Sequence, residues 1–184
     1  RASIERDWHG ACLVPDLRGH GRSFHLPPYA YGTYAADIAS LIGPDEEVFL
    51  VGHSLGGAVA MMLATGWFGL RIKGVVAFGV KVNWSADELA RRKQFAAAPQ
   101  RWFEKRADAV ERYLKVSGQF GLVDPGARAA LSGIAEEDGR FRLAADPRIA
   151  GLDDPPDIRP ILAAARAKAP VRLGVGAKDP MVPV

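Results

Sequence analysis

The sequence predicts an α/β fold: a mostly parallel sheet flanked by helices, with a helical cap insertion. Short apolar runs alternate with helix-like patterns over residues 11–80 and again over residues 158–176, as βα units do. These runs are apolar at odd and even positions alike, which is typical of parallel strands buried on both faces. Residues 83–156 lack this alternation and are charged and amphipathic. We therefore expect residues 1–82 and 157–184 to form the core, and we call residues 83–156 the cap segment.

The composition is that of an ordinary globular protein. The chain has 184 residues, 48% hydrophobic and 24% charged, which is enough for one domain with a substantial core. A formal net charge of +3, carried by scattered lysines and arginines, does not favour nucleic-acid binding. A single cysteine excludes an internal disulfide framework, and no apolar run approaches the roughly 18 residues that span a bilayer. We expect a cytoplasmic protein without a membrane span; the composition leaves its oligomeric state open.

The first predicted elements are short, and their boundaries are marked by glycine, proline and capping residues. Residues 11–15 form an apolar run that is predicted to be a strand, and a loop containing two glycines follows it. Thr33 is the expected N-cap of a helix over residues 34–42, which ends at Gly43-Pro44.

The next three elements form one βαβ unit. Residues 47–51 are predicted to be a strand and residues 55–68 a helix, and residues 74–80 are a second buried strand. The short connections favour a parallel arrangement of the two strands.

The cap segment contains helix signals at regular intervals. Ser85 and Glu88 form a capping box at the start of a charged helix. A second helix is predicted over about residues 107–116, and Asp124-Pro125 is the expected start of a third. Residues 141–145 are too short to assign.

The chain then returns to the core pattern. Residues 153–156 are predicted to be a linker or turn, residues 158–168 a helix, and residues 171–176 a last apolar strand.

One motif indicates chemistry more strongly than any other part of the chain. Residues 51–57 read V-G-H-S-L-G-G and contain the G-x-S-x-G pattern between a strand and a helix. In such a nucleophile elbow, Ser54 occupies a strained turn that lifts its hydroxyl above the sheet edge. Gly52 and Gly56 are expected to flank it because a Cβ at either place would collide with a neighbouring element. The backbone N–H of Leu55 is expected to point toward a developing oxyanion.

Together, three motifs resemble the α/β-hydrolase superfamily. They are Asp16-x-x-Gly19-x-Gly21-x-Ser23 after one strand, the elbow at Ser54 after the next, and Gly176-x-x-Asp179 after the penultimate one. The resemblance implies a triad in the chain order Ser, Asp, His. Ser54 would be the nucleophile, and Asp179 would be the acid that orients the histidine. Asp87 is an alternative acid, although a capping role accounts for it well.

The histidines depart from the family's pattern. The family's base follows the acid after a final strand, but here no histidine follows Ser54. We expect a structural or rim role for each of the four, and therefore no catalytic histidine among these residues. They are His9, His20, His25 and His53.

The start of the chain departs as well. In the family, the second oxyanion donor lies in a loop after a strand that should lie between residues 11–15 and residues 47–51 in the sheet. A His-Gly pair usually marks that loop, and His9-Gly10 resembles the pair only superficially. We therefore expect an incomplete segment of a longer hydrolase, lacking N-terminal strands and the final strand and helix. On its own it should be nearly inactive.

The resemblance implies a serine hydrolase of carboxylic esters, thioesters or lactones that works through an acyl-enzyme. Two alternatives stay open: a cofactor-free haloperoxidase, perhydrolase or carbon–carbon bond hydrolase on the same triad, and a non-catalytic ligand-binding protein of this fold. We expect a small, partly apolar substrate and no cofactor, metal or nucleic acid. Six aromatic side chains of the cap segment are expected either to line an apolar pocket or to form the cap's own core. They are Trp84, Phe95, Trp102, Phe103, Tyr113 and Phe120.

Overall fold

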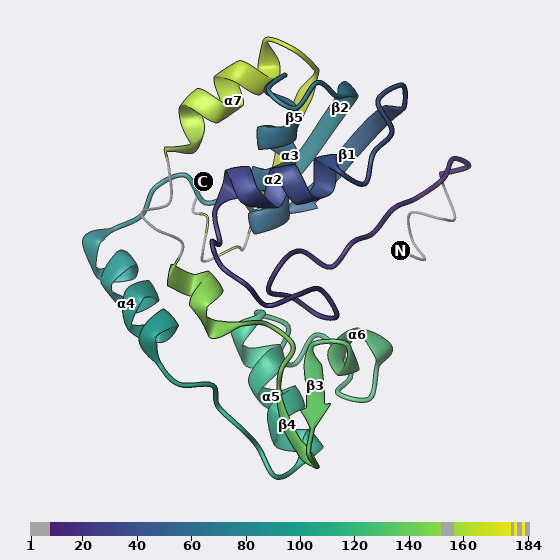
Figure 1. The fold of residues 1–184 in the computed structure, drawn as a ribbon. Helices are drawn as coiled ribbons and strands as arrows, with labels where there is room; N and C mark the ends of the chain where they lie inside the picture. Colours follow the sequence, from purple (N-terminus) through teal and green to yellow (C-terminus); the bar gives the residue numbers. More distant parts are fainter. Residues whose placement is uncertain (1–7, 152–156, 178, 180–181, 183–184) are drawn as a thin grey trace.

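The computed structural model describes residues 8–151, 157–177, 179 and 182. In Figure 1 these residues form two parts, a sheet with its helices above and the cap segment below. The purple stretch near the N-terminus passes between them before it reaches α2. The two groups of elements therefore meet along this stretch.

A parallel three-stranded sheet forms the centre of the upper part. Its strands are β1 (Glu47–His53), β2 (Arg71–Phe78) and β5 (Val171–Gly174), in the order β1-β2-β5. Both pairings are parallel, so the carboxyl ends of the three strands lie at the same edge. The prediction of a mostly parallel sheet flanked by helices is confirmed.

Three helices cover this sheet, and α3 carries most of the core. Besides α3 (Leu55–Leu63), they are α2 (Tyr31–Ala39) and α7 (Ile158–Arg166). Residues 57–63 of α3 are all buried, and α3 packs against β1, β2, α2 and α7. A helix that is apolar all round belongs in the interior of a domain. Because α3 packs against four other elements, the turn at its N-terminus is fixed in position.

The cap segment has a small hydrophobic core of its own. Val110 and Leu114 of its central helix pack there with Ala130. The capping box of Ser85 and Glu88 is confirmed, since each side chain bonds the other residue's backbone N–H. The elements are α4 (Ala86–Ala97), α5 (Arg106–Val116), α6 (Arg128–Leu131), β3 (Ile134–Glu137), β4 (Arg140–Leu143) and η1 (Pro147–Gly151).

Backbone hydrogen bonds join the cap segment to the loop at residues 16–25. The N–H of Gly21 donates to the carbonyl of Ala144 over 2.6 Å, and the N–H of Asp146 donates to the carbonyl of Gly19 over 2.8 Å. His20 and Ala145 form an isolated antiparallel bridge between these contacts. The loop that resembles a family motif therefore also anchors the returning chain.

Four sequence predictions about the fold differ from the structure. The strands were predicted to be buried on both faces, but one face of β1 and β2 is exposed and carries Phe49, Val51, Val76 and Phe78. Residues 11–15 are extended but pair with no strand among the described residues, and Leu13 and Val14 are exposed. A strand needs a partner for its N–H and C=O groups, so an apolar run alone does not make one. Helix α2 begins at Tyr31, which places Thr33 inside it rather than at its N-cap. The cap segment also contains a β3-β4 hairpin, although only helices were predicted there.

Candidate active site

Ser54 occupies a strained turn between β1 and α3. Its φ of 50° and ψ of −118° lie in a region that residues other than glycine rarely adopt. Backbone bonds hold the turn on both sides. Its N–H donates to the carbonyl of Phe78 on β2 over 2.9 Å, and its carbonyl accepts from the N–H groups of Gly57 and Ala58. The Ser54 side chain makes no capping hydrogen bond and is exposed. This geometry agrees with the nucleophile elbow that the motif predicts, which stays a prediction.

Two glycines allow the close approach behind this turn. A Cβ on Gly52 would lie 2.2 Å from the carbonyl oxygen of Gly56, which is backbone and cannot step aside. The collision expected at Gly56 itself is not found, because a Cβ there meets nothing within 4 Å. Instead a Cβ on Gly57 would lie 2.6 Å from Cγ2 of Val80, just after β2, and 3.2 Å from Cβ of Ala77 on β2. Gly57 therefore makes the tight contact between α3 and β2. The prediction that a Cβ on Gly56 would collide with a neighbouring element was wrong.

This difference gives a matched pair of substitutions. Gly52→Ala should destabilise the protein by about 3 kcal/mol or more, because the backbone must shift to admit the Cβ. Gly56→Ala should be neutral or stabilising by up to about 1 kcal/mol, since alanine favours the helix and meets no atom. Urea unfolding curves measure both changes. Equal midpoints for the two variants would contradict the steric argument.

The backbone N–H of Leu55 lies at the start of α3. The first N–H groups of a helix have no partner within the helix, and they carry the positive end of its dipole. Leu55 directly follows Ser54, so its N–H is placed beside the serine. This position agrees with the oxyanion-binding role that the motif predicts, which stays a prediction.

Asp179 and His53 both lie at the same edge of the sheet as Ser54. Asp179 follows β5, and its N–H donates to the carbonyl of Gly176 over 2.9 Å. A Cβ built on Gly79, directly after β2, would lie 2.8 Å from Nε2 of His53 and 3.8 Å from Oδ2 of Asp179. The histidine and the carboxylate therefore approach one another across Gly79. The ring of His53 also contacts that of Phe78, with centroids 5.4 Å apart.

The other candidates of the sequence lie elsewhere. Asp87 is in the first turn of α4 and is exposed, as expected of a residue near a helix N-terminus. His20 directs Nδ1 toward the carbonyl of Arg18 at 3.1 Å. His20 and His25 line cavities at the cap segment rather than the sheet edge. His9 is exposed near the start of the described chain.

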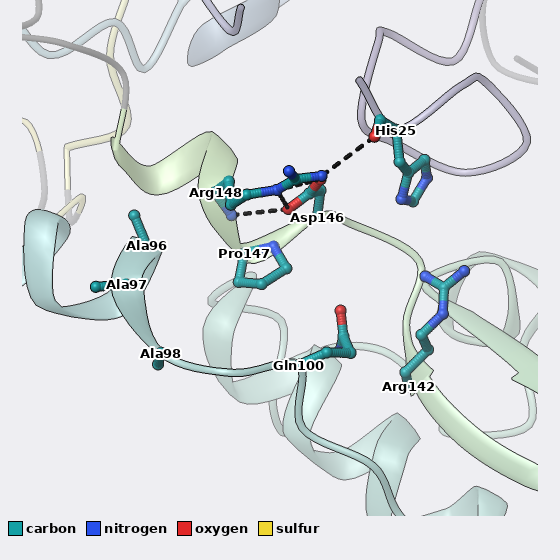
Figure 2. A pocket seen from close by; sticks show the side chains of 9 residues that line it. All are labelled: His25, Ala96, Ala97, Ala98, Gln100, Arg142, Asp146, Pro147 and Arg148. Atoms are coloured by element: carbon teal, nitrogen blue, oxygen red, sulfur yellow. Dashed lines mark hydrogen bonds and ion pairs between the residues drawn. The ribbon is translucent and has the colours of Figure 1, made fainter. Parts of the chain in front are cut away.

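Two cavities lie where the cap segment meets the loop at residues 16–25. The larger, of about 590 Å³, is lined by Phe95 and Phe103, and the smaller, of about 400 Å³, is the polar one in Figure 2. Ser54 and Asp179 line neither cavity. The other cap aromatics have different surroundings. Cations lie over Trp84, Trp102 and Phe120, and Tyr113 packs against the cap's core.

A buried carboxylate beside these cavities was not identified from the sequence. Asp146 is 6% exposed and accepts a hydrogen bond from the Tyr29 hydroxyl over 2.6 Å and from Nη2 of Arg148 over 2.6 Å. Figure 2 shows Arg148 lying between Asp146 and His25, whose carbonyl it also contacts. Burial opposes the charged form, but the hydrogen bonds from Arg148 and Tyr29 outweigh it and lower the pKa of Asp146 to about 2. Burial and Asp146 together raise the pKa of Tyr29 to about 12.

Neither a metal-ligand cluster nor a membrane-spanning helix occurs among the described residues. No three histidine, cysteine or acidic side chains in that part of the chain gather as metal ligands would. None of its helices is long and apolar enough to cross a membrane.

Comparison with known proteins places this geometry in a family. The family described as "Alpha/beta hydrolase family" matches residues 4–184, and the chain belongs to it. The chain is 48% identical over 53 residues to Lipase LipV of Mycobacterium tuberculosis, covering 28% of this chain and 20% of that protein. It is 43% identical over 54 residues to the sn-1-specific diacylglycerol lipase ABHD11 of Danio rerio, covering 28% and 17%. The matched segments thus span a fifth or less of these relatives.

A solved structure extends the similarity over most of this chain. A thermophilic esterase from Thermogutta terrifontis superposes with a TM-score of 0.65, covering 92% of this chain and 62% of that one. Its sequence is 24% identical, so this likeness concerns the fold alone.

Proposed function

We propose that the protein is a serine hydrolase of carboxylic esters, thioesters or lactones, with Ser54 as its nucleophile. The observation that carries the proposal is the positive φ of Ser54 on an exposed turn between a parallel strand and a buried helix. Such strain costs on the order of 1–3 kcal/mol and is retained where the geometry is needed. Family membership and the two lipase relatives support ester chemistry.

The reaction would proceed in two steps, acylation of Ser54 and hydrolysis of the acyl-enzyme. The Oγ of Ser54 attacks the carbonyl carbon and loses its proton to a base, and the alcohol leaves after taking up that proton. The N–H of Leu55 stabilises the negative oxygen of the tetrahedral intermediate. Water then attacks the acyl-enzyme, releases the carboxylic acid and returns the proton to Ser54. Asp179 would orient the imidazole that carries this proton.

We do not assign the base to any of the four histidines. The ring of His53 approaches Gly79 and Phe78, and His20 and His25 line the cavities of the cap segment. Residues 83–156 would serve as a cap that selects small, partly apolar substrates. The 184-residue chain on its own would hydrolyse substrate only slowly. Activity is therefore measured on the full-length protein.

Labelling with a fluorophosphonate probe tests the nucleophile. The full-length protein should form one adduct, and mass spectrometry of its peptides should place the adduct on Ser54. Ser54→Ala should abolish labelling, whereas Ser40→Ala should leave it unchanged, since Ser40 only bonds the carbonyl of Asp37 at the end of α2. An unlabelled but folded protein would favour a non-catalytic, ligand-binding role.

Product analysis distinguishes the remaining chemistry on the same serine. Release of acid and alcohol from simple esters supports the proposal. Peracid formation from acetate and peroxide, or cleavage of a dione, without ester turnover would assign the protein to one of the alternative reactions.

A further inference from the structure

The larger cavity has the size and walls of a small-molecule site. Its volume of about 590 Å³ falls within the roughly 300–1,000 Å³ that is usual for ligand pockets. Apolar side chains from four parts of the cap segment face it: Phe95 on α4, Val116 on α5, Leu143 on β4 and Ile149 on η1. Phe103 adds an aromatic wall. A hydrocarbon chain would be well accommodated there.

Arg112 is a charged group in this wall that has no counter-ion among the described residues. Arg112 of α5 lines the cavity and is half-buried, and its guanidinium has no hydrogen bond or ion pair with any residue that the structure describes. A guanidinium carries a positive charge and presents several N–H donors in one plane, which suits a carboxylate. An anionic ligand in this cavity would find Arg112 without a competing partner among the described residues.

Two carboxylates near this cavity are already paired. Glu111, the neighbour of Arg112 on α5, bonds Lys115, and Asp146 at the other side of the cavity bonds Arg148 and Tyr29. A second guanidinium, that of Arg101, also lines the cavity, where it stacks over the ring of Phe103 at 4.9 Å.

The adjoining cavity in Figure 2 is different, because its arginines have partners. Arg142 bonds Glu137, and Arg148 bonds Asp146. The two cavities share Asp146 and Pro147 in their walls. The uncompensated positive charge thus belongs to the apolar cavity.

We propose that the larger cavity binds an amphipathic monocarboxylate, with its hydrocarbon chain against Phe95, Val116 and Leu143 and its carboxylate paired with Arg112. The planar guanidinium can bond both carboxylate oxygens, which fixes the head group while the apolar walls take the chain. Ser54 does not line this cavity, so binding there requires no ester chemistry.

Calorimetric titration with decanoate tests the site on the full-length protein. Arg112→Gln should weaken binding of decanoate by roughly 10- to 100-fold, the loss of a charge-assisted pair. Decanol, which has the same chain without the charge, should bind weakly and equally to both proteins. Arg91→Gln on the exposed face of α4 removes the same charge away from the cavity and should leave binding of decanoate unchanged.

Three outcomes would overturn the proposal: no decanoate binding by the unmodified protein, equal affinity for decanol, or unchanged decanoate affinity in Arg112→Gln. Circular dichroism checks that the variant is folded. If it is not, the comparison of decanoate with decanol on unmodified protein decides. Ser54→Ala should bind decanoate normally, so failure of the hydrolase proposal and failure of this one are separate results.

Discussion

Ester hydrolysis by the full-length protein should fall by about a million-fold when Ser54 is replaced by alanine. Removing the serine of such a triad costs on this order because no covalent intermediate forms. What remains is the binding and oxyanion stabilisation by the Leu55 N–H, which is worth roughly a thousand-fold or more over water. Initial rates with a chromogenic ester measure the change.

The backbone of this variant should be preserved. Alanine has the same backbone restrictions as serine at a φ of 50°, and the Ser54 side chain makes no capping bond that alanine would lose. The free energy of unfolding of Ser54→Ala should therefore stay within about 0.5 kcal/mol of that of the unmodified protein. Ser40→Ala serves as the control for both measurements. A Ser54→Ala protein that keeps more than a few per cent of the activity would rule out this serine as the nucleophile.

The elbow motif could be predicted from sequence because most of its determinants are local. A strand, a sharp turn and a helix follow one another within residues 47–63, and the requirement for glycine at position 52 comes from its contact with Gly56. The glycine that packs α3 on β2 could not be chosen in the same way. Gly56 and Gly57 are adjacent, and only the direction of the helix shows that position 57 faces Val80.

Features that depend on distant parts of the chain were missed. The run at residues 11–15 has the composition of a strand, but strand formation depends on a neighbour that local composition does not supply. Asp146 and Tyr29 are 117 positions apart, and no local pattern links them. Asp146 precedes a proline and resembles an ordinary turn residue in the sequence. Its burial becomes evident only once the cap segment meets the loop at residues 16–25.

Replacing Asp146 by alanine should destabilise the protein by about 3 kcal/mol. The Tyr29 hydroxyl would lose its acceptor in a buried place, and the guanidinium of Arg148 would lose its counter-ion. Breaking a buried pair usually costs about 3–5 kcal/mol, and we expect the low end because the Arg148 side chain is 54% exposed. Asp45→Ala removes a similar pair with Arg71, but Asp45 is 89% exposed, so it should cost less than about 1 kcal/mol.

The same carboxylate should make stability depend on acid pH. The pKa of Asp146 is lowered from 3.8 to about 2 in the folded protein, so its charged form favours folding. That contribution, about 2 kcal/mol, is complete above about pH 4 and disappears as the pH falls toward 2. Urea midpoints measured from pH 6 to pH 2 should therefore fall less steeply in Asp146→Ala than in the unmodified protein. Parallel curves would show that the charge of Asp146 does not stabilise the folded protein.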